Sequence, residues 1–383
     1  MNKIYDFIII GAGCAGLSLA YRLRDKKFKI CLIESSSDIN LRNKTWSFWN
    51  TYDTPFNHLA RKKWDQMVIR NNNETQKINC SKFNYQSIDS KEFNDFVLEE
   101  IDSNKNIDIK YMSNVLGIIN NKNNVEVLTK EATYECSHVF DSRPDSREIY
   151  MWQQFYGVYV KTKEDVFEDN TAILMDFSKI EDKFHFMYVL PFSKNTALIE
   201  STYFSSNKET KCMDDKYIES YMASEYKNTK YRIEKKEHGS IPMDPTICNL
   251  SNTYITKIGA YSGITRASTG YTFINIQKQL DRITERIEIG KNKTYKTKTY
   301  KTNKYFHSFV LRKMDSIFLK IIKENPAYMK AALISLFRGK NHNSQIKFLS
   351  DIPGIIDIIK IILCLPKLKF LKYALGLNDK KNR

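Results

Sequence analysis

Apolar and polar positions follow two different periods at the start of the chain, and together they predict a strand–helix–strand unit. Residues 7–10 are continuously apolar, which is typical of a strand buried on both faces. Apolar side chains then recur at helical spacing over 14–24, and a further apolar run covers 29–33. We therefore expect two parallel strands joined by a helix.

The pattern changes in the middle of the chain. Before it, helical spacing covers 85–100, and short strand-like runs lie at 107–111, 125–128 and 138–140. From there on, turn-like segments separate longer strand-like runs, which favours an antiparallel sheet of the kind that forms a substrate wall. These runs are 155–160, 171–177, 186–190 and 197–204.

A glycine-rich corner directly follows the first apolar run. Gly11 would permit a tight turn, Gly13 would let the backbone approach a pyrophosphate, and Gly16 would let the helix pack on the strand. Glu34 ends the next strand, near the position roughly 20 residues on where an acid binds ribose hydroxyls. An acid there favours FAD or NAD over NADP. A tight turn without a ligand is the alternative.

A later strand and helix, at 255–260 and 271–280, come after the antiparallel runs. We therefore expect an α/β fold with a discontinuous, Rossmann-like nucleotide-binding domain at 1–150 and 251–285. The antiparallel sheet would occupy 151–250, and the remainder, 286–383, would be a C-terminal region.

Composition and charge add a question about partners. The 383 residues carry a formal net charge of +16, which suggests an anionic partner such as nucleic acid or an acidic lipid surface. No nucleic-acid motif is visible, so we expect no nucleic-acid partner. The richness in Lys together with Asn has another interpretation, a compositional bias of the genome.

Cysteine and histidine positions give no sign of a metal site. The seven cysteines form no C-x-x-C pair and the six histidines are dispersed, so we expect neither a metal centre nor a disulfide framework. The chain is typical of a reduced, intracellular protein. Because a strand is predicted to begin near Ile4, we also expect no signal peptide.

The C-terminal segment 351–375 is apolar and basic. Its most apolar run, 354–366, is interrupted by Asp357 and Lys360, and is shorter than the ~20 residues needed to cross a bilayer. The lysines that follow alternate with leucine and phenylalanine. Two interpretations stay open: an amphipathic segment in a membrane interface, or a core helix with a basic outer face.

Nine segments, in a constant order, resemble the lycopene beta-cyclases of bacteria and plants, which are flavoproteins of carotenoid synthesis. They are spread over residues 4 to about 280, and the remaining residues match only in a general way. The segments are 11–16, 43–46, 85–93, 139–144, 153–157, 174–177, 188–200, 238–243 and 258–273.

The resemblance implies an FAD-binding domain, an antiparallel substrate-binding sheet and a helical C-terminal part. It implies an isomerase that closes the linear ends of lycopene into β-ionone rings, giving γ-carotene or β-carotene. FAD would act in its reduced form without being consumed, with NAD(P)H as the electron donor.

Glu200 stands where this family has its essential carboxylate. Strand alternation places Leu198 and Glu200 on one face and Ile199 on the other. Burial would raise the pKa of Glu200 and keep it protonated as a general acid. Whether Glu200 or the flavin delivers the proton stays open, and a surface carboxylate on an edge strand is the alternative from the local sequence.

By the same resemblance, a loop containing Gly259, Gly263 and Gly270 would close over the flavin, with Thr269 and Tyr271 nearby. Four other side chains each have two interpretations. Trp46 and Trp49 are either pocket residues or core residues; Arg143 is either a phosphate ligand or part of an ordinary salt bridge; Asp176 is either a further acid of the site or a residue outside it.

The expected partners are lycopene or a related linear carotene and a membrane surface, at which the protein would be monotopic on the cytoplasmic face. The sequence leaves open the oligomeric state and the choice between one and two rings. A redox enzyme of the same superfamily, a monooxygenase or an isoprenoid reductase, is an alternative function. A non-catalytic, membrane-associated flavin-binding protein is another.

Overall fold

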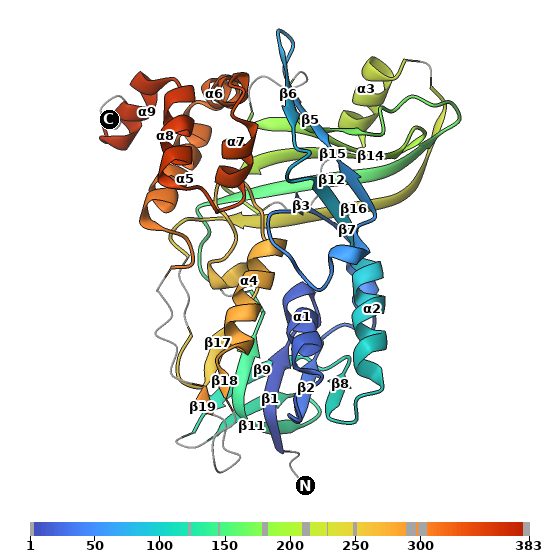
Figure 1. Ribbon diagram of the computed structural model, residues 1–383. Coiled ribbons are helices and arrows are strands. Elements are labelled where there is room, and N and C mark those ends of the chain that lie inside the picture. The colour runs from blue at the N-terminus through green and yellow to red at the C-terminus, as the bar shows by residue number, and fades with distance from the viewer. Residues whose placement is uncertain are drawn as a thin grey trace.

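The strand–helix–strand unit forms the centre of the first sheet (Figure 1). The computed structural model describes residues 4–121, 124–144, 146–177, 183–208, 215–227, 229–247, 251–288, 296–297 and 305–377. In spatial order the strands of this sheet are β8 (Ile107–Lys110), β2 (Ile30–Ile33), β1 (Ile4–Ile10), β11 (Thr133–Asp141), β10 (Val125–Thr129) and β9 (Val115–Asn120), with β17 (Ile255–Lys257) beside β11.

The parallel part of this sheet contains strands from both ends of the predicted discontinuous domain. β1 pairs in parallel with β2 and β11, and β17 pairs in parallel with β11. On one face pack the helices α1 (Cys14–Leu23), α2 (Ser90–Asp102) and α4 (Phe273–Thr284). Their apolar sides form one core with the strands, as their helical spacing predicted.

The predicted helix at 85–100 was wrong at its start. Its first residues form β7 (Tyr85–Asp89), a strand buried along its whole length. The Asp89 carboxylate accepts a hydrogen bond of 2.8 Å from the Lys91 amide and so caps α2. β7 lies between β3 (Thr45–Trp49) and β4 (Lys62–Trp64) in a small antiparallel sheet.

The second sheet contains the predicted antiparallel strands. In spatial order it consists of β16 (Tyr231–Met243), β12 (Met151–Thr162), β15 (Thr196–Ser205), β14 (His185–Ser193), β13 (Thr171–Asp176), β5 (Gln66–Arg70) and β6 (Thr75–Asn79). The predicted boundaries placed 66–79 with the nucleotide-binding part, but β5 and β6 belong to this sheet. The division of the chain into domains otherwise stays a prediction.

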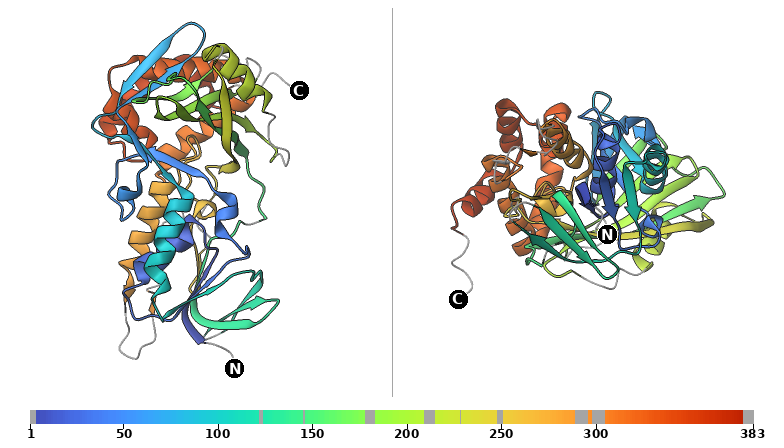
Figure 2. Two further views of the ribbon diagram at one scale, coloured as in Figure 1. Left: turned by 90° about the vertical axis from the view of Figure 1, so that its right-hand side faces the viewer. Right: turned by 90° about the horizontal axis from the view of Figure 1, so that it is seen from below.

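Helices cover both faces of the second sheet. On one face α3 (Lys216–Glu225) packs in a core with β12, β14 and β15. On the other lie the C-terminal helices, which share one end of the elongated molecule with the second sheet (Figure 2, left). They are α5 (Phe309–Glu324), α6 (Pro326–Arg338), α7 (His342–Leu349), α8 (Ile355–Cys364) and α9 (Lys367–Ala374). Short elements complete the described chain: η1 (Ile39–Arg42), η2 (Asn57–Leu59), η3 (Ala260–Ser262), β18 (Ile287–Glu288) and β19 (Lys296–Thr297).

A buried arginine joins the loop before α4 to the C-terminal helices. Arg266 is 0% exposed, and its Nε donates to both carboxylate oxygens of Asp315 at 2.9 and 2.8 Å. Its Nη1 donates to Asp351 at 2.5 Å and to the Phe348 carbonyl at 3.0 Å. Burying a charge is tolerated when it is paired in this way, so these contacts fix α5 and the end of α7 to the loop.

Candidate functional site

The glycine-rich corner has the geometry that its residue types predicted. Gly11 has φ +95°, and a Cβ there would lie 2.3 Å from Ser142 Oγ. A Cβ on Gly16 would lie 1.9 Å from the Gly11 carbonyl oxygen, so the start of α1 packs directly on the turn. By contrast, a Cβ on Gly13 would meet nothing within 4 Å. Gly13 is the N-cap of α1 and offers open space at the positive end of the helix.

Glu34 is hydrogen-bonded to this corner. Its Oε2 accepts from the Ala12 amide at 2.8 Å, and its Oε1 accepts from the Ser36 amide at 2.8 Å. The acid therefore lies at the end of β2 beside the glycine turn. Each carboxylate oxygen has two lone pairs, so Glu34 can accept further hydrogen bonds from hydroxyl groups.

The loop from η3 to α4 lies against α1. Gly259, Gly263 and Gly270 have φ values of +77°, +81° and +71°, in the left-handed region that glycine adopts without strain. A Cβ on Gly259 would lie only 3.1 Å from the Ala15 Cβ. The two glycine-rich stretches, distant in the sequence, are thus neighbours. Gly270 lines the cavity described next.

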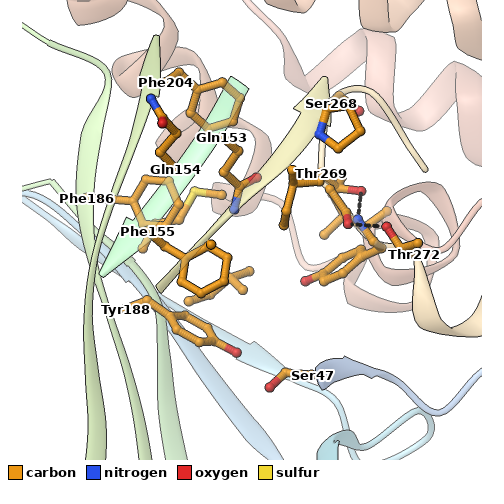
Figure 3. A pocket seen from close by; sticks show the side chains of 18 of the residues that line it. Ser47, Gln153, Gln154, Phe155, Phe186, Tyr188, Phe204, Ser268, Thr269 and Thr272 are labelled. Atoms are coloured by element: carbon orange, nitrogen blue, oxygen red, sulfur yellow. Dashed lines mark hydrogen bonds between the residues drawn. The ribbon is translucent and has the colours of Figure 1, made fainter. Parts of the chain in front are cut away.

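A cavity of about 1560 Å³ extends from the start of α1 to the C-terminal helices. Its lining is mainly apolar. Leu174, Phe186, Leu198 and Phe204 come from the second sheet, Phe184 directly precedes β14, and Phe318, Met329, Leu333, Leu336 and Ile361 come from helices. Figure 3 shows Phe155, Phe186 and Tyr188 on one side of it, opposite Ser268 and Thr269. A long apolar ligand fits such a lining.

Glu200 lies on the cavity wall and is 8% exposed. The alternation predicted for β15 is confirmed, because Leu198 also lines the cavity while Ile199 packs in the core on the opposite face. Glu200 Oε1 accepts a hydrogen bond of 2.7 Å from Thr202 Oγ1. Burial raises the pKa of Glu200 to about 8, and the negative charge of Glu237 contributes further. The Thr202 hydrogen bond opposes this rise.

Glu237, on β16, is a site residue that sequence reasoning missed. It is buried and lines the same cavity as Glu200. Its Oε2 accepts a hydrogen bond of 3.0 Å from Thr45 Oγ1. Burial raises the pKa of Glu237 to about 7, against the opposing effects of Thr45 and of the Lys235 charge. The available signal was its position directly before 238–243, one of the segments that carried the family resemblance.

Three phenols, one buried and two partly buried, lie beside the acid or line the same cavity. Tyr188 is directly opposite Glu200 in the pairing of β14 with β15, and its hydroxyl lies 2.9 Å from the Tyr85 hydroxyl. Burial raises the pKa of Tyr188 and of Tyr85 well above the ordinary value. Burial also raises the pKa of Tyr271, which lines the same cavity, to about 12. These phenols therefore stay neutral near pH 7 and act as hydrogen-bonding groups.

The other aromatic candidates have different locations. Trp46 lines the cavity and stacks on Phe273 at a centroid distance of 5.5 Å. Trp49 is 1% exposed and packs edge-to-face on Tyr85, as a core residue does. Thr269 lines the cavity.

The two polar candidates are in salt bridges. Arg143 donates from Nε and Nη2 to Asp141 at 2.9 and 3.0 Å. Asp176 accepts from Arg70 Nε at 2.6 Å and from the Tyr221 hydroxyl at 3.0 Å. A β-bulge between Ile173 and Asp176 interrupts the alternation of β13 and turns Asp176 to the α3 face.

Residues 6–375 match the family described as lycopene cyclase protein. The chain belongs to the lycopene cyclase family. Among curated relatives, the lycopene beta cyclase, chloroplastic/chromoplastic, of Capsicum annuum is 21% identical over 296 residues. The chloroplastic lycopene beta cyclase of Arabidopsis thaliana is 23% identical over 300 residues. Each alignment covers 70% of this chain and 57% of the relative, so this lycopene cyclase family member spans little more than half their length.

Solved structures share the fold of this lycopene cyclase family member at low sequence identity. A geranylgeranyl bacteriochlorophyll reductase-like protein of Thermoplasma acidophilum has a TM-score of 0.63 at 12% identity, covering 99% of this chain and 100% of the other. The flavin-dependent brominase Bmp2 has a TM-score of 0.63 at 13% identity, with the same coverage. The halogenase PltM, in a complex with phloroglucinol and FAD, has a TM-score of 0.57 at 10% identity, covering 97% and 98%. The expected α/β architecture is therefore confirmed.

Proposed function

We propose that this chain is an FAD-dependent lycopene beta-cyclase, an isomerase that closes the linear ends of lycopene into β-ionone rings. The observation that carries the proposal is the location of Glu200, a carboxyl with a raised pKa in the wall of a long apolar cavity. A protonated acid with no water around it is what alkene protonation requires.

The reaction balances without an oxidant or a reductant. The Glu200 carboxyl gives its proton to the terminal alkene, which leaves a tertiary cation on the neighbouring carbon. The next double bond attacks this cation and a ring carbon–carbon bond forms. A proton then leaves the adjacent ring carbon to form the ring double bond, so no atom is gained or lost.

The residues of the cavity support each step. A pKa of about 8 keeps Glu200 mostly protonated at neutral pH. Phe155, Phe186 and Tyr188 present aromatic rings to the cavity, and their faces stabilise a cation. The apolar side chains exclude the water that would otherwise trap it.

The glycine-rich corner fits FAD. The open space at Gly13 and the N-terminal end of α1 would receive the pyrophosphate, and Glu34 would accept the ribose hydroxyls. When bound in its reduced form, FAD would supply negative charge that stabilises a cation. NAD(P)H is the reductant that we propose for it.

Co-expression in lycopene-producing bacteria tests the proposal. We expect the wild-type chain to turn red colonies orange-yellow, with cyclic carotenes in the extracted pigments. Glu200→Gln should retain bound FAD and leave lycopene unchanged, whereas the matched control Asp176→Asn should still form rings. Lycopene left unchanged by FAD-loaded wild-type protein would contradict the proposal. Oxygenated or reduced pigments would instead indicate the redox alternative.

The exposed apolar side chains of α8 and α9 bear on where the protein is located. Large apolar side chains on them are strongly exposed, with Ile355 and Leu368 at 80% and Ile356 at 70%. Ile362 and Leu371 are both exposed and part of the cavity lining, so these helices lie at an opening of the cavity. No helix of the described residues is long and apolar enough to cross a bilayer.

The proposed partner of this surface is the anionic face of a bilayer, the cytoplasmic one. Lys360, Lys367, Lys369 and Lys372 lie on the same two helices and match anionic headgroups in charge. A carotene dissolved in the membrane would then reach the cavity without crossing water. We therefore propose monotopic association, in which α8 and α9 lie in one face of the bilayer.

Sedimentation with vesicles tests this partner. We expect binding to vesicles that contain phosphatidylglycerol and weak binding to pure phosphatidylcholine. Ile356→Ser with Leu368→Ser should weaken binding roughly tenfold or more, because two large apolar groups are lost from the interface. The control Leu116→Ser changes a residue that is 60% exposed on β9 and should bind as wild type does. Equal binding of the double variant would show that α8 and α9 are not the contact.

A further inference from the structure

Two buried carboxyl groups share one row of the second sheet. Gly157 on β12 is directly opposite Glu200 on β15 and directly opposite Glu237 on β16. Residues opposite each other in adjacent strands point to the same face, so both carboxyls project into the cavity. Their backbones are two strand spacings apart, roughly 10 Å.

The residue between the two acids leaves a gap. A Cβ on Gly157 would lie 3.5 Å from both Cβ and Cγ of Glu200 and 3.0 Å from Leu198 Cδ1. Without a side chain at this position, no group of β12 stands between the acids in the row. The two carboxyl groups therefore interact across the cavity and not through an intervening side chain of β12.

Each acid has its own surroundings. Glu200 faces Tyr188 on β14 and the hydroxyl of Thr202 on its own strand. Glu237 faces Thr45 on β3, whose hydroxyl donates to it and also contacts the Tyr159 hydroxyl on β12.

Charged groups lie mainly on the Glu237 side. Lys44, Lys235 and Asp89 act on Glu237 electrostatically. The Nζ of Lys235 also pairs with Asp89 at 3.0 Å. Across the gap, Glu237 itself is the charged group that acts on Glu200.

We propose that Glu237 is a positioning residue for the acid of this site: held by Thr45, its carboxylate faces Glu200 across the Gly157 gap and keeps the proton on Glu200. This inference rests on the proposed function. A negative charge near a second carboxyl disfavours ionisation of that carboxyl. Glu200 therefore holds its proton until the alkene takes it.

The same field acts after the proton has left. An ionised Glu200 next to an ionised Glu237 is unfavourable, so Glu200 regains a proton readily. The proton released from the ring carbon balances the proton that was given to the alkene. One pair of acids can thus complete a cycle without net exchange of protons with water.

Carboxyl-selective NMR on the FAD-loaded protein, with ¹³C-labelled glutamate, tests the inference. The spectrum of Glu200→Gln assigns the Glu200 resonance. In Glu237→Gln, we expect the titration midpoint of Glu200 to fall by about one pH unit, which is tenfold in its ionisation constant. Glu237→Asp, which keeps the charge, should restore most of the shift. The control Glu234→Gln removes an exposed acid from the same strand and should leave the midpoint unchanged.

Kinetics give a second readout. In Glu237→Gln the falling alkaline limb of ring formation should move to lower pH by the same amount, with little change at pH 6. A purely structural role would lower the rate at every pH. An unchanged Glu200 midpoint in folded Glu237→Gln would overturn the inference.

The wild-type titration covers the case in which Glu237→Gln does not fold. Coupled acids titrate in two steps, so the Glu200 resonance should respond where Glu237 ionises. A simple one-site curve would overturn the inference. Because this measurement needs no ring formation, its failure is distinguishable from failure of the proposed function.

Discussion

The two faces of the second sheet treat buried acids in opposite ways. On the α3 face, Asp176 is 1% exposed and is held by Arg70 at 2.6 Å and by Tyr221 at 3.0 Å. On the cavity face, Glu200 is 8% exposed, and among the described residues no cation lies within salt-bridge distance of it. Asp176 therefore joins β5 to α3 through Arg70 and Tyr221, whereas Glu200, whose pKa is raised by burial, keeps its proton and is available for chemistry.

The largest expected effect comes from removing the unpaired acid. Glu200→Gln should lower the rate of ring formation by roughly 10²–10⁴-fold, the range for loss of a general acid. Its free energy of unfolding should be unchanged or slightly higher, because an amide has no ionisation to suppress. Carotenoid chromatography and thermal unfolding measure the two quantities. If Glu200→Gln also unfolded much more easily than wild type, Glu200 would be a structural acid like Asp176, and the two faces would not differ in this way.

Removing the paired acid should have the reverse result. Asp176→Asn should lower the free energy of unfolding by about 1–3 kcal/mol, because Arg70 loses its buried carboxylate partner but keeps Glu225 at 2.6 Å. The rate per folded molecule should stay close to wild type. Urea unfolding monitored by circular dichroism checks the first value. A rate loss like that of Glu200→Gln would place Asp176 in the chemistry after all.

The acid on the cavity face, Glu200, should also make the stability of the protein depend on pH. The pKa of Glu200 is raised to about 8 in the folded state, so between the unfolded value and pH 8 the native protein binds a proton that the unfolded chain has lost. Stability should therefore fall as pH rises through this window, by at most about 1.4 kcal/mol per pH unit. Urea midpoints compared with those of Glu200→Gln isolate this contribution, and identical pH profiles would contradict it.

The smallest expected effect concerns the gap at Gly157. Gly157→Ala should change the free energy of unfolding by less than about 1 kcal/mol, since the new methyl group only displaces the end of the Leu198 side chain. Ring formation should be reduced far less than in Glu200→Gln. The same unfolding and pigment measurements apply. A large loss of unfolding free energy or of ring formation would mean that no side chain is tolerated at position 157, between the two acids.

Local features of the fold were predictable, and features set by long-range pairing were not. The turn at Gly11 and the alternation around Glu200 depend on short stretches, because glycine preference at a turn and the period of a strand are set locally. The edge strand β6 is mostly exposed and polar, so it carries almost no apolar period. The charged strand β16 hides its pattern for the same reason.

The site shows the same limit. Glu237 enters the cavity because of the register between β16 and β12, which no local pattern of β16 encodes. Asp176 follows an apolar run much as Glu200 does, yet the bulge in β13 turns it to the other face. Of the two interpretations left open for Asp176, the structure supports the second, a residue outside the site, and the topology decided which acid reaches the cavity.

The C-terminal helices that line the cavity are of two kinds, because only some of them are held by the ionic contacts of Arg266. α5 and the end of α7 are tied to the glycine loop through Asp315 and Asp351, so displacing them would require separating buried charges. The contacts that hold α8 and α9 include hydrogen bonds such as that from Tyr328 to the Pro366 carbonyl, 2.9 Å, at a partly solvated boundary. Local unfolding should therefore begin at α8 and α9. Amide protons of these helices should exchange with deuterium well before those of α5.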